Sequence, residues 1–256
     1  MKAHISEIFS SLQGEGIYQG VRQIFVRFAG CNLNCDYCDT PESRVISVRC
    51  KVKGEKQEIA NPVSTEDLIG LLTYPSFPNP YSLNNCHSLC LTGGEPLLQV
   101  DFLEEFIPAV RDFYSSVLSK PKELGLKIYL ETNGTLPEKL DKIVNLVDFI
   151  AMDIKLPSAT GKSFFPRHRH FLELGGRKVF VKIVLTGNTK NEEIWETISL
   201  VKNINREIPF VLQPVILNSE VSLPKTQDIL TWYTWAKKNL ADVRILPQKH
   251  KTWGLK

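Results

Sequence analysis

Three cysteines with the spacing C-x3-C-x2-C constrain this chain more than any other feature. Cys31, Cys35 and Cys38 lie within one ten-residue stretch, 31–40. This spacing allows a short loop to place three thiolates around one cluster of iron and sulfide. With no fourth cysteine close by, one iron would stay open to a small-molecule ligand. Two alternatives remain: a zinc site, although structural zinc takes four protein ligands, and cysteines that are simply buried.

Composition and charge are those of an ordinary globular protein. The 256 residues are 43% hydrophobic and 23% charged, so we expect a sizeable core. The net charge of +3 is too small to indicate nucleic acid as a main ligand. The N-terminal residues show no export signal, and no run is apolar enough to cross a bilayer. Six cysteines in such a chain indicate reduced thiols or metal ligands, and we expect a cytoplasmic protein without membrane contact.

Strand and helix patterns alternate along most of the chain. A polar, glycine-bracketed turn is expected at 9–16, before a first apolar strand at 23–29. Strands separated by helices indicate parallel βαβ units. About six such units fit the length, so we expect one α/β domain over residues 1–256, an incomplete parallel (β/α)6-type barrel open along one side. Further strands are expected at 88–92, 127–131, 148–154, 178–185 and 209–213, and helices near 101–117, 138–146, 191–204 and 224–240.

Residues 41–63 interrupt this alternation, and we expect them to form a hairpin inserted into the barrel. Apolar and polar residues alternate here, which is the period of a half-buried strand. Residues 53–56 would form the turn of the hairpin. The alternating apolar positions are Ile46, Val48, Cys50 and Val52.

Polar residues gather where the predicted strands end, and parallel α/β barrels place their sites at this edge. Thr92-Gly93-Gly94-Glu95-Pro96 ends the second strand. Its glycines permit close backbone approach, and Glu95 can pair with an ammonium group. Charged residues inside apolar strands are costly unless paired or liganded, so the alternative for Asp153 is an ion pair with a nearby lysine. The remaining strand-end residues are Glu131, Thr132, Asn133, Gly134, Asp153, Lys155, Lys182, Gln213 and Pro214.

The cysteine spacing, Tyr37 and Gly93–Pro96 together resemble the radical S-adenosylmethionine (SAM) enzymes, in which SAM occupies the open iron. Leu12–Gly16, Arg27–Cys31, Asp39-Thr40 and the C-terminal Arg244–Lys251 more specifically resemble 7-carboxy-7-deazaguanine synthases. This resemblance covers the chain from residue 12 onward. It implies a carbon–nitrogen lyase that contracts 6-carboxy-5,6,7,8-tetrahydropterin to 7-carboxy-7-deazaguanine and releases ammonia, in the biosynthesis of queuosine-type tRNA bases. It also implies a radical SAM barrel, a [4Fe-4S] cluster, SAM, Mg²⁺ and a homodimer.

The resemblance also implies roles for residues of this chain. Cluster ligation falls to Cys31, Cys35 and Cys38. Mg²⁺ coordination falls to Thr40, whose hydroxyl is the kind of hard oxygen that this ion accepts. The residues implied for SAM are Tyr37, Cys38, Asp39, Gly94, Glu95, Thr132, Asn133, Asp153, Lys155, Lys182, Gln213 and Pro214. The residues implied for the pterin are Leu12, Gln13, Gly14, Glu15, Arg27, Thr92, His250 and the C-terminal Lys256.

The substrate chemistry agrees with three of these assignments. A pterin presents an amide N–H and a 2-amino group along one edge, and the carboxylate of Glu15 can accept both hydrogen bonds. Gln13 offers one donor and one acceptor to the same ring. The planar guanidinium of Arg27 suits the substrate carboxylate. The alternative is a mutual salt bridge between Glu15 and Arg27 that pins the N-terminal turn.

Several features depart from the family pattern or allow a second interpretation. Asp153-Ile154-Lys155 stands where many members have Ser-Pro-Lys, so only Lys155 matches the family pattern at this strand end. Cys50, Cys86 and Cys90 can ligate an auxiliary cluster, but their scatter favours plain packing. The basic run 167–170 suggests tRNA or a reductase, but a solvated loop is the commoner explanation.

Two rival functions remain. A glycyl-radical enzyme activase shares the cysteine spacing but has no use for Gln13–Gly16. A non-enzymatic iron–sulfur electron carrier would saturate its iron with four cysteines. For the synthase, we expect an external one-electron reductant of the flavodoxin or ferredoxin type, and no direct contact with nucleic acid.

Overall fold

The computed structural model describes residues 1–52, 57–73, 83, 86–118, 125–216 and 221–254. Ten strands form one sheet in the order β12-β11-β10-β9-β8-β7-β3-β2-β4-β5. From β3 to β12, every pair of neighbouring strands is parallel. These strands are β3 (Arg22–Phe28), β7 (Ser88–Gly93), β8 (Ile128–Thr132), β9 (Phe149–Asp153), β10 (Val179–Leu185), β11 (Phe210–Pro214) and β12 (Val243–Ile245).

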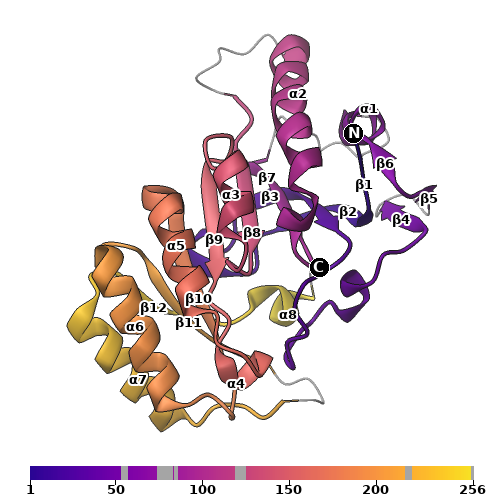
Figure 1. The fold of residues 1–256 in the computed structure, drawn as a ribbon. Coiled ribbons are helices and arrows are strands. Elements are labelled where there is room, and N and C mark those ends of the chain that lie inside the picture. The colour runs from indigo at the N-terminus through magenta and orange to yellow at the C-terminus, as the bar shows by residue number, and fades with distance from the viewer. Residues whose placement is uncertain (53–56, 74–82, 84–85, 119–124, 217–220, 255–256) are drawn as a thin grey trace.

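The helices that connect the parallel strands lie side by side along one face of the sheet (Figure 1). Neighbours pack in the order α1, α2, α3, α5, α6, α7, which is the arrangement that right-handed crossovers produce. The C-terminal α8 lies apart from this layer. The helices are α1 (Thr65–Thr73), α2 (Val100–Leu118), α3 (Pro137–Ile143), α4 (Pro157–Thr160), α5 (Phe165–Gly175), α6 (Asn191–Asn205), α7 (Thr226–Asn239) and α8 (Lys249–Trp253).

Both faces of the parallel strands are buried, as the continuous apolar runs predict. On β3, Ile24 and Val26 face the helices and belong to the large core. Phe25 faces the interior of the curved sheet, where it joins a second cluster and stacks on Phe9 with ring centroids 4.8 Å apart. The sheet is therefore an incomplete barrel of the expected type. The connecting helices lie on its outside, and this layer of helices does not cover its open side.

The prediction of a polar turn at 9–16 is wrong for residues 9–12. Residues 9–12 belong to β2 (Ile5–Leu12), which pairs antiparallel with β3. Ser10 and Ser11 obscured the apolar alternation, although Phe9 is buried. The three-residue β12, which lengthens the predicted row of six parallel strands, was also not predicted because it is too short to show a period.

The inserted hairpin is present but shorter than predicted. β4 (Arg49–Val52) pairs antiparallel with β5 (Gln57–Ala60), and β4 also joins β2 at the edge of the main sheet. Cys50 and Val52 are buried, whereas Ile46 and Val48 are exposed and precede the strand. The predicted turn at 53–56 lies outside the described residues. A separate two-stranded sheet joins β1 (Lys2–Ala3) and β6 (Val63–Ser64).

The basic run 167–170 is not a solvated loop. It lies within α5, where His168 is fully buried while Arg167, Arg169 and His170 are exposed. The charged residues on either side obscured an inward-facing position of an amphipathic helix. Within the described part of the chain, none of the helices combines the length and apolar character that a bilayer crossing requires.

Candidate active site

Six neighbouring strands carry an apolar side chain toward the interior and, two residues later, a polar one. Side chains two apart on a strand share a face, so an apolar layer is followed by a polar layer at the carboxyl ends. The apolar members form one buried cluster, and the polar members line one cavity of about 330 Å³. The pairs are Phe25/Arg27, Cys90/Thr92, Tyr129/Glu131, Ala151/Asp153, Phe180/Lys182 and Val211/Gln213.

The three cysteines of the C-x3-C-x2-C loop line the same cavity as the polar layer. Cys35 is buried, and Cys31 and Cys38 are half-buried. Burial raises the pKa of the Cys31 and Cys35 thiols, and the nearby Lys155 ammonium opposes that shift. Metal ligation requires thiolates, and a cation beside the loop favours them. All three thiols are free, so the donor set fits a three-cysteine cluster.

The zinc alternative fits less well. Among the described residues, no three His, Cys, Asp or Glu side chains converge so that they hold a single metal ion. Zinc requires such convergence of its ligands. An iron–sulfur cubane binds each thiolate to a different iron and does not require it.

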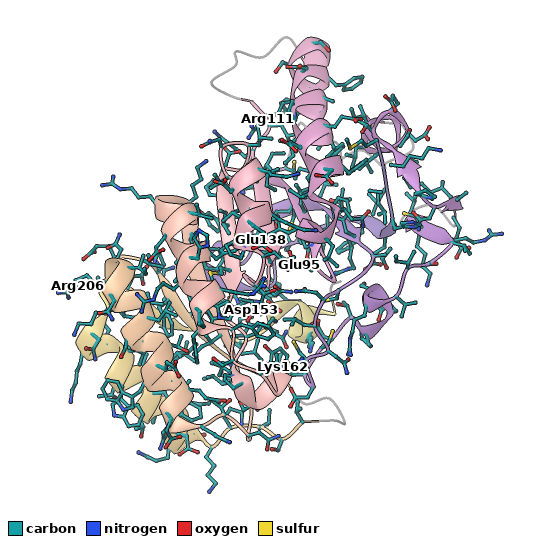
Figure 2. All side chains as sticks on the ribbon, viewed as in Figure 1. Glu95, Arg111, Glu138, Asp153, Lys162 and Arg206 are labelled. Atoms are coloured by element: carbon teal, nitrogen blue, oxygen red, sulfur yellow. The ribbon has the colours of Figure 1, made fainter. Side chains whose placement is uncertain are left out.

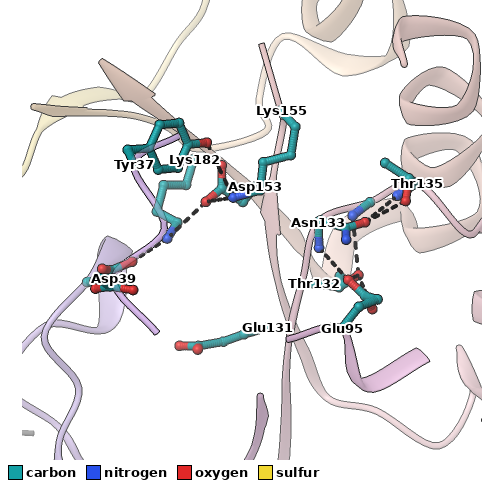
Figure 3. A network of polar contacts seen from close by, with 12 residues as sticks. Tyr37, Asp39, Glu95, Glu131, Thr132, Asn133, Thr135, Asp153, Lys155 and Lys182 are labelled. Atoms are coloured by element: carbon teal, nitrogen blue, oxygen red, sulfur yellow. Dashed lines mark hydrogen bonds and ion pairs between the residues drawn. The ribbon is translucent and has the colours of Figure 1, made fainter. Parts of the chain in front are cut away.

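Charged side chains form a chain across the cavity floor (Figure 3). Lys182 pairs with both Glu15 and Asp153, the latter at 3.3 Å between Nζ and Oδ2. Lys155 reaches the same Asp153 oxygen at 2.9 Å and the Tyr37 hydroxyl at 3.3 Å. The ion pair considered for Asp153 is therefore present, with both lysines. Asp153 Oδ1 is buried without a hydrogen-bond partner among the described residues.

The mutual salt bridge considered for Glu15 and Arg27 is wrong. Arg27 Nε instead contacts Glu7 Oε1 at 2.8 Å, because these residues face each other across β2 and β3. Arg27 also lies 5.4 Å from the centre of the Phe9 ring. Glu15 accepts from Lys182 and, at 2.7 Å, from Gln248 Nε2. The two predicted substrate residues thus have separate partners in one cavity.

A second polar group holds Gln13 and Thr92. Gln13 Nε2 donates to Glu131 Oε1 at 2.8 Å, and Thr92 Oγ1 donates to Glu131 Oε2 at 2.6 Å. Gln13 Nε2 also reaches Gln23 Oε1 at 2.9 Å. Glu7 and Gln248 were not predicted as site residues. Glu131 was expected among the polar residues at the strand ends, but no ligand was assigned to it.

Glu95 is completely buried at the end of β7 and is not in contact with the cavity surface. Its carboxylate accepts from Thr132 Oγ1, Asn133 N and Leu97 N at 2.8–3.0 Å. Burial raises its pKa to about 7, and these hydrogen bonds oppose that rise. Direct pairing with an ammonium, as predicted, would have to replace one of these donors. Figure 2 shows Glu95 and Asp153 near the molecular centre, while Arg206 and Lys162 project outward.

The glycines beside Glu95 allow a close approach of two backbone segments. A Cβ at Gly94 would lie 2.2 Å from the carbonyl oxygen of Gly30. Glu95 N donates to that same Gly30 oxygen at 2.9 Å. Gly30 immediately precedes Cys31, so these glycines seat the cysteine loop against the end of β7.

The other predicted residues divide into three groups. The C-terminal segment reaches the site, since Lys249 N donates to Gly14 O at 2.9 Å, but the His250 side chain and all of Lys256 lie outside the described residues. Pro214 is half-buried and outside the cavity lining, whereas Gln213 is buried with no partner among described residues for either amide atom. The remaining residues line the cavity: Leu12, Gly14, Tyr37, Asp39, Thr40, Gly94, Thr132 and Asn133.

The three other cysteines pack as apolar residues. Cys50 and Cys90 are fully buried in different apolar clusters, and Cys86 is half-buried against the larger one. Burial raises the pKa of the Cys50 thiol to about 12, so this thiol is protonated at neutral pH. The structure favours the packing interpretation over an auxiliary cluster.

Comparisons with known proteins identify the family of this chain. A family model described as the radical SAM superfamily matches residues 25–207. The 7-carboxy-7-deazaguanine synthase of Geobacter sulfurreducens is 38% identical over 98% of this chain and 97% of its own length. The enzyme of that name from Archaeoglobus fulgidus is 37% identical over 100% of both chains.

Two crystal structures share the fold. QueE from Escherichia coli superposes with a TM-score of 0.60 and 20% identity, over 98% of this chain and 95% of its own. A radical SAM methyltransferase from Sphaerobacter thermophilus gives a TM-score of 0.58 and 11% identity, over 94% and 77%. The predictions of a radical SAM fold, a [4Fe-4S] cluster and SAM are thus confirmed at the level of the family. This chain belongs to the radical SAM superfamily and, within it, to the 7-carboxy-7-deazaguanine synthase family.

Proposed function

We propose that this protein contracts 6-carboxy-5,6,7,8-tetrahydropterin to 7-carboxy-7-deazaguanine and releases ammonia, as a lyase of 7-deazapurine biosynthesis. The observation that carries the proposal is that the polar layer and the cysteine loop line one cavity. Its volume of about 330 Å³ lies within the range of small-molecule sites. The cluster and SAM supply the one-electron chemistry that removes a hydrogen atom, and the protein orients the reactants and excludes water.

The pterin would lie along the Gln13–Glu15 segment. Glu15 would accept the amide and amino protons, and Gln13 would hydrogen-bond the same ring. Glu131 fixes the orientation of Gln13 and Thr92 through hydrogen bonds of 2.8 and 2.6 Å, which lowers the entropic cost of substrate binding. The substrate carboxylate would pair with Arg27, whose side chain is held by Glu7. Leu12, Gly14, His250 and the Lys256 carboxylate would complete this subsite.

SAM would lie between the cysteine loop and the ends of β7 to β11. Cys31, Cys35 and Cys38 would hold the cluster, whose open iron takes the methionyl group. The buried but unpaired Asp153 Oδ1 and the two unpaired Gln213 amide atoms are polar groups that a ligand would satisfy. The other contacts proposed for SAM are Tyr37, Asp39, Gly94, Glu95, Thr132, Asn133, Lys155, Lys182 and Pro214.

Mg²⁺ would bind at Thr40, between the cysteine loop and the pterin. Thr40 lines the cavity, and its side chain makes no capping hydrogen bond to the short helix that follows. A hydroxyl ligand with substrate and water oxygens completes the octahedron that Mg²⁺ requires. Thr40→Val should abolish stimulation of turnover by Mg²⁺, whereas Thr40→Ser should retain it. Equal Mg²⁺ stimulation in Thr40→Val would show that the ion binds elsewhere.

The proposal includes two partners and a compartment. An external one-electron donor of the flavodoxin or ferredoxin type would reduce the cluster, and the enzyme would act as a cytoplasmic homodimer. A single domain would carry the whole activity.

An anaerobic assay tests the function. Reconstituted protein would receive reductant, SAM, Mg²⁺ and the carboxytetrahydropterin, and mass spectrometry would follow the 7-carboxy-7-deazaguanine product. We expect product and released ammonia in equal amounts. SAM cleavage without this product would contradict the proposal and favour another radical SAM activity, such as a glycyl-radical enzyme activase. A preparation of Cys35→Ala serves as the cluster-free control.

A further inference from the structure

Three polar side chains form a closed hydrogen-bonded ring between the cysteine loop and the end of β8. Asn32 Nδ2 donates to Thr135 Oγ1 at 2.9 Å, and Thr135 Oγ1 donates to Asn133 Oδ1 at 2.6 Å. Asn133 Nδ2 closes the ring by donating to Asn32 Oδ1 at 2.9 Å. All three bonds run in one direction around the ring, so each polarises the next. Figure 3 shows Asn133 and Thr135 beside Glu95 and Thr132.

Hydrogen bonds to groups outside the ring hold Asn133 and Thr135 in place. Asn133 N donates to Glu95 Oε2 at 2.8 Å, and Asn133 O lies 3.2 Å from His168 Nε2. A carbonyl only accepts, so His168 carries its proton on Nε2. Arg167 Nη1 donates to Thr135 O at 2.9 Å. The basic run on α5 therefore supports the ring, and Asn133 and Thr135 cannot shift without breaking buried hydrogen bonds.

The ring attaches the cysteine loop beside Cys31 through side chains, as the Tyr37 hydroxyl and the Asp39 carboxylate attach its far end to Lys155 and Gln248. Other attachments use backbone atoms. Gly30 bonds to Glu95 and Ser43 through backbone atoms at 2.9 and 2.8 Å, and Asp36 N donates to Ala159 O at 3.2 Å. Asn32 directly follows Cys31 and is exposed on its outer side. Replacement of Asn32 would therefore loosen the loop at Cys31 without emptying a core position.

We propose that Asn32 is a positioning residue, which acts through Asn133 and Thr135 to fix Cys31 and its iron relative to the strand ends that hold SAM. SAM must reach the open iron and the ends of β7 and β8 at once, so a loop displaced by a fraction of an ångström weakens both sets of contacts. The inference depends on this protein binding the iron–sulfur cluster and SAM, as its family does. It does not depend on the pterin being the substrate.

Four variants test the inference on the reconstituted full-length protein without pterin. Asn32→Ala and Thr135→Val remove members of the ring. Thr135→Ser keeps the hydroxyl, and Asn34→Ala is the matched control, because Asn34 is an exposed asparagine of the same loop. The measurements are iron and sulfide per chain, the SAM dissociation constant by calorimetry, and the change that SAM causes in the electron paramagnetic resonance spectrum of the reduced cluster.

We expect Asn32→Ala and Thr135→Val to keep their iron, to bind SAM about tenfold more weakly, and to show an altered spectral response to SAM. Thr135→Ser and Asn34→Ala should stay within about twofold of wild type. A fifth protein, the double variant Asn32→Ala/Thr135→Val, should bind SAM no more weakly than the single variant with the lower SAM affinity, because either substitution alone already breaks the ring. Unchanged SAM affinity and spectra in Asn32→Ala would overturn the proposal. Loss of iron in both ring variants would also overturn it, because the ring would then merely hold the fold. Since no pterin is added, failure of the substrate assignment leaves these readouts intact.

Discussion

The Lys182 ammonium is ion-paired with the Glu15 carboxylate, although 167 residues separate them in the sequence. The pair joins the interior face of β10 to the turn that follows β2. Lys182 also contacts Asp153, which pairs with Lys155 as well, so two cations balance two carboxylates in the polar layer. The Glu15 oxygens proposed to receive the pterin are therefore already oriented before substrate arrives.

Lys182→Met should destabilise the protein. The side chains of Lys182, Glu15 and Asp153 are only 14%, 18% and 11% exposed, and replacing Lys182 removes a positive charge from beside two largely buried carboxylates. We expect the free energy of unfolding to fall by about 3 kcal/mol, measured by urea denaturation. Lys142→Met, which breaks the exposed pair with Asp101, should leave it nearly unchanged. Equal losses in both variants would contradict a special role for the buried network.

Arg27→Lys should weaken binding of the pterin carboxylate. A lysine cannot reproduce the planar fork of the guanidinium, and hydrogen bonds between charged groups contribute about 1.5–3 kcal/mol. We expect KM for the pterin to rise by roughly tenfold to a hundredfold, with little change in SAM binding. The control is Arg111→Lys, which alters a 2.6 Å ion pair with Asp148 away from the cavity. A KM that changes equally in both variants would refute the assignment.

Cys35→Ala should abolish cluster assembly. With two thiolates left, the cubane loses one of its protein ligands, and iron and sulfide per chain should fall to background after reconstitution. Cys50→Ala is the matched control, because Cys50 is buried by packing in β4. We expect it to keep its iron while losing about 1 kcal/mol of stability. Full iron content in Cys35→Ala would refute the cluster assignment.

Glu95 should make the apo protein less stable as pH rises. Burial raises its folded-state pKa from 4.5 to about 7, so the folded state holds a proton that the unfolded state releases between these values. This contribution is complete below pH 4.5 and is lost as pH rises through 7. Relative to Glu95→Gln, wild type should lose roughly 2 kcal/mol between pH 5 and 7.5. A constant difference in urea midpoints across this range would show that Glu95 does not titrate there.

His168 should have the opposite effect over an overlapping range. Burial lowers its folded-state pKa from 6.5 to about 4, so the unfolded state takes up a proton first as pH falls. The contribution is complete above pH 6.5 and is lost as pH falls through 4. Relative to His168→Gln, which keeps a donor toward Asn133, wild type should lose roughly 2 kcal/mol between pH 7 and 4.5. Parallel curves for the two proteins would contradict this expectation.

Much of the fold was predictable because strand and helix periods are local. The six parallel strands predicted from apolar runs are present in the predicted order, as is the inserted hairpin. Local patterns failed where tertiary packing decided the outcome. Ser10 and Ser11 lie on a strand because they pair with Ile24 and Gln23 of β3, and the charged run at 167–170 lies in a helix that buries His168.

The sequence by itself determined the chemistry of the C-x3-C-x2-C loop, since spacing limits which ligands three thiolates can hold. It also determined that polar residues lie at the ends of the parallel strands, because the alternation of residues with a period of two can be recognised in the sequence itself. Only the tertiary structure decided their partners: Arg27 with Glu7 rather than Glu15, Glu15 with Lys182, and Glu95 with Thr132 and Asn133. Partners are set by strand order and register, which here bring together residues from 20 to 167 positions apart, and no local pattern records those distances.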